Sequence, residues 1–219
     1  MIYNKDIART TAEFLLQIKA VKLNAGNPFT WASGLKSPIY CDNRKILSFP
    51  KIRTFVRQEF VGMINDLFGP VDLIAGVATG AIAHGVLVAQ ELGYPFVYVR
   101  PQEKKHGLEN RIEGHLEAGQ SVVVVEDLVS TGKSSLQAVQ ALRDAGCEVK
   151  GMVAIFSYDL AVADKAFKES NCLLYTLSDY NELLQQAIEN NYIHEDDLST
   201  LIEWRKSPSE WSAKNGGKA

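Results

Sequence analysis

The chain has 219 residues, of which 46% are hydrophobic and 22% charged, so it can build the core of one α/β domain without disulfides or a structural metal. Its net charge of −3 argues against general nucleic-acid binding, which needs a face rich in Lys and Arg, but it allows a local basic site. No apolar run could span a membrane, no signal peptide is visible, and three scattered cysteines fit neither a disulfide framework nor a zinc site, so we expect a cytoplasmic protein with reduced thiols.

The first 70 residues predict two helices joined by a long loop. Apolar residues recur at helical spacing between residues 6 and 20, and again over residues 50–67, where Ser48 is expected to cap the helix and Pro50 suits its first turn. Residues 24–43 are rich in Gly, Pro, Ser and Asn, which predicts a loop with two short extended pieces.

Residues 71–178 alternate between strands and helices. The run from Ser121 to Val125 contains four successive valines, as expected for a strand buried on both faces of a parallel sheet. Right-handed crossovers between such strands predict an α/β fold with a doubly wound parallel sheet. The strands are expected over 72–77, 96–99, 121–125, 148–156 and 173–177, and the helices between them over 81–92 and 134–145.

We expect one domain over residues 1–219, in three parts. Residues 1–70 would form the N-terminal helices and a small hood, residues 71–178 the sheet core, and residues 179–219 the C-terminal helices and a tail. The tail from Ser207 onward is polar and is expected to fray. Residues 100–114 are also polar and predict a long loop after the strand at 96–99.

The most informative segment is Val122–Ser135, with the sequence VVVVEDLVSTGKSS. It places two carboxylates, Glu126 and Asp127, at the carboxyl end of a buried strand, where open α/β sheets bind their ligands. The loop that follows, of small hydroxyl residues and glycine, opens a helix, and its N–H groups suit a phosphate. Paired carboxylates can accept hydrogen bonds from vicinal hydroxyls, so the segment predicts a site for a sugar with a phosphate at one end.

Two other interpretations of this segment are possible. The sequence Gly132-Lys133-Ser134 matches the end of a nucleotide-binding P-loop, but the required first glycine would stand at position 127, which is an aspartate. Two carboxylates would also repel a triphosphate. In the second interpretation the carboxylates only cap the next helix, although a cap needs one acceptor rather than two.

The segment Val122–Ser135 resembles the phosphoribosyl pyrophosphate motif of type I phosphoribosyltransferases. Two further segments narrow the family to the orotate phosphoribosyltransferases. Residues 98–114 resemble the mobile catalytic loop of that family, and Phe29–Tyr40 resembles its base-binding segment. With Gly76–Gly80, whose backbone would contact pyrophosphate unless it is a plain strand-to-helix turn, the resemblance covers most of residues 20 to 160.

The resemblance implies an enzyme that joins orotate to the ribose of phosphoribosyl pyrophosphate in the synthesis of UMP, as a homodimer with shared active sites. Magnesium would be bound through substrate and water, with no direct protein ligand. Lys104, His106 and Asp127 would be catalytic. The residues assigned to phosphoribosyl pyrophosphate are Arg100, Lys104, Lys105, His106, Glu126, Asp127, Leu128, Val129, Ser130, Thr131, Gly132, Lys133 and Ser134. Those assigned to orotate are Lys36, Tyr40, Cys41, Arg44 and Ser130.

The chain departs from many members of that family at three positions. Ala32 and Pro101 stand where a lysine is usual, and Tyr158 where some members have an arginine. We therefore expect Lys36 or Arg44 to hold the carboxylate of orotate. Three other functions remain open at this stage: a phosphoribosyltransferase for a purine or uracil, a regulator that senses phosphoribosyl pyrophosphate and binds RNA, and a P-loop nucleotidase.

Overall fold

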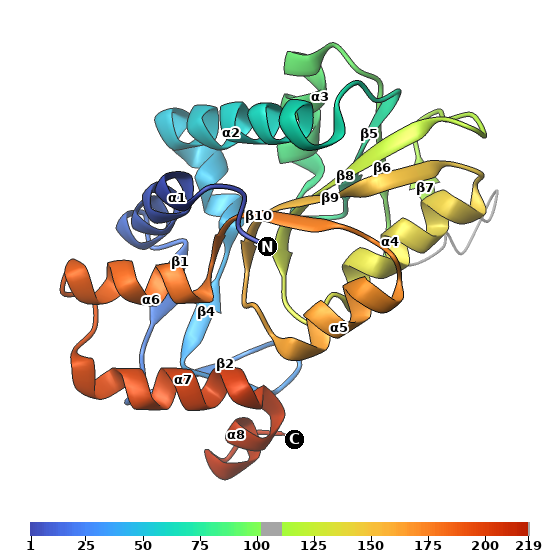
Figure 1. The fold of residues 1–219 in the computed structure, drawn as a ribbon. Coiled ribbons are helices and arrows are strands. Elements are labelled where there is room, and N and C mark those ends of the chain that lie inside the picture. Colours follow the sequence, from blue (N-terminus) through green and yellow to red (C-terminus); the bar gives the residue numbers. More distant parts are fainter. Residues whose placement is uncertain (102–110, 219) are drawn as a thin grey trace.

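A six-stranded sheet forms the centre of the molecule, seen in a computed structural model that describes residues 1–101 and 111–218 (Figure 1). Its order is β10-β9-β8-β5-β6-β7, and all neighbours are parallel except β6 and β7. This confirms the predicted doubly wound α/β fold and adds an antiparallel edge strand within the expected loop. The strands are β5 (Leu73–Val77), β6 (Phe96–Val99), β7 (Ile112–Glu113), β8 (Ser121–Val129), β9 (Glu148–Ser157) and β10 (Leu174–Asp179).

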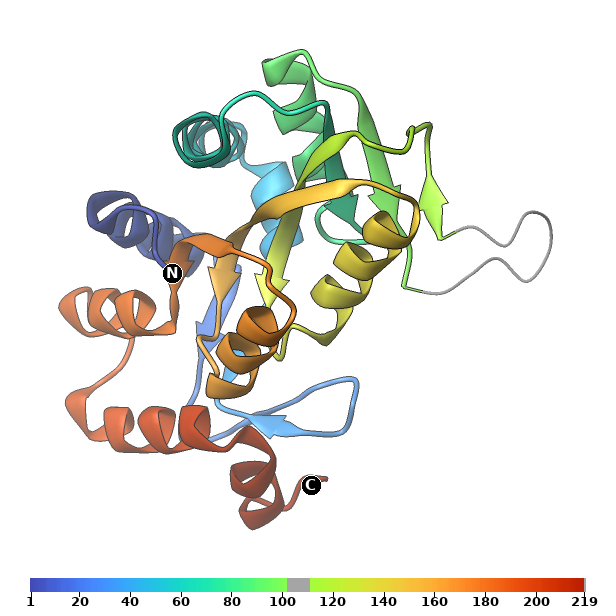
Figure 2. The ribbon, with the colours of Figure 1, turned by 45° about the vertical axis from the view of Figure 1, so that its right-hand side comes forward.

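Helices cover both faces of the sheet, as the uninterrupted apolar strands require. One face packs against α2 (Pro50–Phe68) and α3 (Ile82–Leu92), and the other against α4 (Lys133–Asp144) and α5 (Ala161–Glu169) (Figures 1 and 2). Along β8, Val123 and Val125 join the first core, whereas Val122 and Val124 join the second. This alternation buries every one of these valines completely and fixes the direction of each later side chain in the strand.

The N-terminal part adds α1 (Lys5–Gln17) and two small antiparallel ribbons beside the sheet. In these ribbons β1 (Val21–Leu23) pairs with β4 (Ile39–Cys41), and β2 (Phe29–Thr30) pairs with β3 (Lys36–Ser37). A 3-10 helix, η1 (Asn43–Ser48), connects them to α2.

The expected cap of the second helix is wrong. Ser48 ends η1, and Phe49 takes the cap position of α2 without a side-chain hydrogen bond. Pro50 begins that helix as predicted. Because proline has no N–H to satisfy, the start of the helix depends less on a polar cap.

The C-terminal part differs most from expectation. The helices α6 (Tyr180–Glu189) and α7 (Leu198–Lys206), with a 3-10 turn η2 (Glu195–Asp197) between them, lie where helices were predicted. The tail, however, does not fray: it forms a further helix, α8 (Pro208–Lys214), whose Trp211 is only 4% exposed. Ser212 in the same helix accepts a hydrogen bond from the backbone N of Lys36 at 2.9 Å.

This C-terminal helix therefore packs on the β2–β3 ribbon (Figure 2). The backbone N of Lys218 also donates to the carbonyl of Gly34, at 3.2 Å, at the tip of the same ribbon. The prediction of a frayed tail failed because it weighed overall polarity, whereas two buried side chains are enough to dock a short helix. Within residues 1–101 and 111–218, no helix combines the length and the hydropathy of a membrane span.

Replacement of the buried indole at position 211 tests this docking. We expect Trp211→Ala to lower the free energy of unfolding by about 3–5 kcal/mol, the usual cost of removing a buried Trp side chain. Urea denaturation followed by circular dichroism measures the change, with Lys214→Ala on the exposed side of the same helix as the control. An unchanged midpoint for Trp211→Ala would mean that α8 is not packed in solution.

Candidate active site

The two carboxylates of the predicted motif lie inside β8 and not in a turn. β8 continues to Val129 because its last residues keep pairing with β9, Leu128 opposite Phe156 and Val129 opposite Ser157. The predicted turn from residue 127 is therefore shorter than expected and lies between Val129 and Lys133, where α4 begins. Glu126 and Asp127 are thus held by sheet hydrogen bonds, so their backbone positions are fixed before any ligand binds.

The turn itself leaves the start of α4 open to an anion. Gly132 is its cap residue, with φ of 79° and no side-chain hydrogen bond to the helix. A Cβ at this position would come within 2.9 Å of the Phe167 ring, so both conformation and space favour glycine. The first N–H groups of α4 receive no side-chain cap, and such groups bind phosphate well. The interpretation in which Glu126 and Asp127 only cap this helix is wrong.

Glu126 is buried, with 4% exposure, and both of its oxygens are occupied. Oε2 accepts from the Ser135 hydroxyl at 2.8 Å, and Oε1 accepts from the backbone N of Asp127 at 3.0 Å. Burial, followed by the charge of Asp127, raises the pKa of Glu126 well above its usual range. Glu126 therefore ties the end of β8 to the first turn of α4, and it is the less available of the two carboxylates.

Asp127 lies against the turn that follows β5, the strand beside β8. A Cβ built on Gly80 would collide with Oδ2 of Asp127, so the carboxylate lies directly against the glycine backbone. Burial raises the pKa of Asp127, and the charge of Arg44 opposes part of that rise. The close approach brings two predicted segments together, Gly76–Gly80 and the carboxylate motif, at one edge of the sheet.

A cavity of about 280 Å³ opens beside the end of β8. It brings together Tyr40, Cys41 and Ser130, three residues predicted to bind orotate. It also includes Leu128, which was assigned to phosphoribosyl pyrophosphate. Its wall is completed by Trp31, Ala32 and Tyr158. Trp31 and Tyr158 stack with ring centroids 5.7 Å apart and ring planes 15° apart. The cavity is therefore largely apolar, with a flat aromatic side suited to a planar heterocycle.

Two of these lining residues, Ala32 and Tyr158, stand at positions where the sequence departs from the family that it resembles. Sequence reasoning did not place them in one wall, since they are 126 positions apart, and it missed Trp31 altogether. The signal that could have identified Trp31 is its aromatic side chain within the predicted base-binding segment. Trp204 of α7 packs edge-on against both Trp31 and Tyr158, with centroids 5.9 and 5.5 Å away. A residue from the C-terminal part therefore supports the wall of this cavity.

The two candidate cations, Lys36 and Arg44, occupy different places. Lys36 lies in β3 and is absent from the cavity lining, while its backbone bonds Ser212. Arg44 pairs with Asp42 at 2.6 Å and keeps 59% of its side chain exposed. Because its charge also acts on Asp127, Arg44 is the cation nearer to the carboxylate edge.

The predicted basic loop is described only at its ends. Arg100 follows β6 and pairs with Glu113 at 3.4 Å, while the backbone N of Arg100 donates to the carbonyl of Arg111 at 2.8 Å. Lys104, Lys105 and His106 lie outside the described residues.

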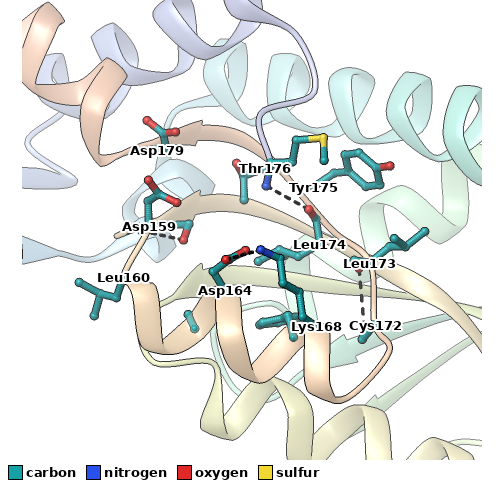
Figure 3. A pocket seen from close by; sticks show the side chains of 14 residues that line it. Asp159, Leu160, Asp164, Lys168, Cys172, Leu173, Leu174, Tyr175, Thr176 and Asp179 are labelled. Carbon is teal, nitrogen blue, oxygen red and sulfur yellow. Dashed lines mark hydrogen bonds and ion pairs between the residues drawn. The ribbon is translucent and has the colours of Figure 1, made fainter.

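A second cavity, lined by α5, by β10 and by the residues that follow β9, is not part of this site (Figure 3). None of the predicted site residues lines it. Three carboxylates surround it, but each has a structural partner: Asp159 pairs with Arg205 at 2.8 Å, Asp164 pairs with Lys168 at 2.7 Å, and Asp179 caps α6. The figure shows Asp164 and Lys168 joined across one turn of α5.

Comparison with known proteins agrees with the geometry at the end of β8. A family model described as the phosphoribosyl transferase domain matches residues 45–176, which include α2 through the first half of β10 and therefore both carboxylates. Fold and site thus define a phosphoribosyltransferase.

Full-length relatives narrow the class. An orotate phosphoribosyltransferase of Bacteroides fragilis is 58% identical over 94% of this chain and 98% of its own length, and one of Bacteroides thetaiotaomicron is 57% identical over 95% and 99%. The crystal structure of orotate phosphoribosyltransferase from Aeropyrum pernix is 25% identical, with a TM-score of 0.71 over 84% of this chain and 99% of that one. The chain belongs to the orotate phosphoribosyltransferases.

The burial of Glu126 makes a prediction about stability and pH. A carboxyl group whose pKa is raised by folding binds its proton more tightly in the native state, so its contribution to stability is present at acid pH and is lost as pH rises. We therefore expect Glu126→Gln, which removes the charge but keeps a similar shape, to raise the urea midpoint relative to wild type at pH 8.

The gain should shrink towards pH 4, where the native carboxyl is already protonated. Paired urea titrations at several pH values measure it. A midpoint for Glu126→Gln that is lower than that of wild type at pH 8 would contradict the assigned burial cost.

Proposed function

We propose that this chain transfers the 5-phosphoribosyl group from phosphoribosyl pyrophosphate to orotate, giving orotidine 5′-phosphate and pyrophosphate in the synthesis of UMP. One observation carries the proposal: the end of β8 belongs to two sites at once. Leu128 and Ser130 line the apolar cavity, while Asp127 and the open start of α4 stand on either side of them along the chain. A base in the cavity would therefore lie beside a ribose held by the motif.

Each part of the motif suits one part of the sugar phosphate. The turn and the first N–H groups of α4, residues 130–134, would bind the 5′-phosphate. Asp127, and to a lesser extent Glu126, would accept hydrogen bonds from the ribose hydroxyls. The ring nitrogen of orotate then forms a bond to the anomeric carbon while the carbon–oxygen bond to pyrophosphate breaks, through a transition state with oxocarbenium character.

Metal and loop complete the proposal. Among the described residues, no group of three or more His, Cys, Asp or Glu side chains could hold a metal ion. Magnesium would be bound through substrate oxygens and water, where it would screen the charge of pyrophosphate. Arg100 stands at the base of the loop, and Lys104, Lys105 and His106 are proposed to stabilise the departing pyrophosphate.

Orotate is favoured over other bases by the full-length relatives and by one local feature. Its carboxylate needs a cation that a purine or uracil does not, and Arg44, partly exposed near the carboxylate edge, is our candidate. The proposal also includes a homodimer with shared active sites and a cytoplasmic location, as the sequence predicted. Analytical ultracentrifugation of the purified chain tests the dimer.

The reaction can be followed directly. We expect orotate absorbance to fall when phosphoribosyl pyrophosphate and magnesium are added to the purified protein, and to recover when excess pyrophosphate reverses the reaction. Hypoxanthine, adenine and uracil, each followed by chromatography of the products, are the controls. Turnover of one of these bases with none of orotate would overturn the proposed substrate while keeping the phosphoribosyl chemistry.

The contact between Gly80 and Asp127 makes a sharper prediction. A methyl group at position 80 must displace the Asp127 carboxylate, so Gly80→Ala should fold but lose about ten- to a hundredfold in kcat/KM, the equivalent of one charged hydrogen bond. Gly62→Ala is the matched control, since a Cβ at Gly62 in α2 meets nothing within 4 Å. Steady-state kinetics decide between them. Equal activity of the two variants would show that the position of Asp127 does not matter for transfer.

A further inference from the structure

Asn43, the first residue of η1, is 1% exposed and makes hydrogen bonds to two parts of the proposed site. Its Nδ2 donates to the backbone carbonyl of Asp127 at 2.6 Å, 84 positions away. Its Oδ1 accepts from the Cys41 thiol at 3.2 Å. A buried amide with both ends occupied is costly to replace and rigid in position. One side chain therefore joins the carboxylate motif to the wall of the base cavity.

The bond to Asp127 falls where the sheet gives β8 less support. β5 pairs with β8 only as far as Val125, whereas β9 continues beside it to Val129. The last four residues of β8 are thus paired with a strand on one side only. Asn43 supplies a hydrogen bond to this extension from outside the sheet.

A third segment meets the same residue. His84, in the first turn of α3, hydrogen-bonds the backbone of Asn43 and is 2% exposed. Burial lowers the pKa of His84 to about 4, so its ring is neutral near pH 7. α3 begins just after Gly80, the residue that touches the Asp127 carboxylate. Asn43 is therefore in contact with the cavity wall, the carboxylate strand and the helix behind the Gly76–Gly80 turn.

We propose that Asn43 is a positioning residue for the transfer reaction, holding the ribose-binding strand end and the base cavity at a fixed distance from each other. The inference rests on the proposed function, since it assumes that ribose and base occupy these two places. Asn43 itself need not touch either substrate. Its effect would pass through the backbone of Asp127 and the side chain of Cys41.

Two substitutions separate positioning from simple filling of space. Asn43→Ala removes both side-chain bonds but keeps the backbone group that His84 contacts. We expect it to fold, to weaken binding of phosphoribosyl pyrophosphate and to lower kcat/KM, each by about three- to tenfold, the equivalent of one neutral hydrogen bond. Asn65→Ala, at an exposed asparagine of α2, is the control and should change neither.

Asn43→Asp adds a readout that a structural role would not give. The introduced carboxyl group can donate to the Asp127 carbonyl only when it is protonated. When ionised, it would add negative charge to a place already close to Asp42 and Asp127, where Arg44 is the opposing cation among the described residues. Two further titratable neighbours, Cys41 and His84, are neutral near pH 7. The activity of Asn43→Asp relative to wild type should therefore rise as pH falls from 8 to 6, while the ratio for Asn43→Ala stays flat.

Calorimetric titration with phosphoribosyl pyrophosphate and steady-state kinetics, on variants shown to be folded at each pH, give the result. Wild-type constants in Asn43→Ala, or a ratio for Asn43→Asp that does not change with pH, would overturn the positioning role. If the wild-type chain failed to convert orotate, the proposed function would fall. The binding titration would then still decide the role of Asn43 at the ribose site.

Discussion

The extension of β8 beyond its neighbour β5 is the constraint on which the site depends. Strand pairing with β9 carries Glu126 and Asp127 to the edge of the sheet while four valines before them are completely buried. The buried valines fix the position of the strand, and the sheet hydrogen bonds fix the backbone of the two carboxylate residues without help from a ligand. Burial raises the pKa of both carboxyl groups, and the charge of Asp127 raises that of Glu126 further. Acceptors held in this way are pre-organised for hydroxyl donors.

Neighbouring segments then adapt to that strand end. The Gly80 backbone lies where a side chain would collide with the Asp127 carboxylate, and Gly132 allows the turn that opens α4. Both glycines are thus required by close approach or by a positive φ, and they belong to different strand–helix connections. The meeting of two such connections at adjacent parallel strands is the usual position of a ligand in an α/β sheet.

The sequence predicted what depends on local pattern. Four consecutive valines identified the central strand, and the order of carboxylates, hydroxyl residues and glycine indicated the phosphoribosyltransferase family, because these features are continuous in the chain. It could not predict contacts between distant segments. The turn was expected to begin at Asp127, since nothing local shows that β9 keeps pairing as far as Val129. The tail after Ser207 was judged by its polarity, although it forms a helix whose Ser212 accepts a hydrogen bond from Lys36, 176 positions earlier. The site residues Lys104, Lys105 and His106 are not tested by the described residues.

The apolar cavity shows why its specificity cannot be assigned to one segment. Its aromatic wall combines Trp31 from the N-terminal part with Tyr158, which follows β9, and Trp204 of α7 packs across both rings. Tyr180, at the start of α6, packs in turn against Trp204, with centroids 5.4 Å apart. At Ala32 and Tyr158 the wall of the cavity is uncharged, and Trp204 of α7 supports it from the C-terminal part. None of the described residues that line this cavity is acidic, so a buried cation at either place would lose hydration without an ion-pair partner. Under the proposed function, a base carboxylate would need a cation from outside this wall, and Arg44, whose charge acts on Asp127, is our candidate.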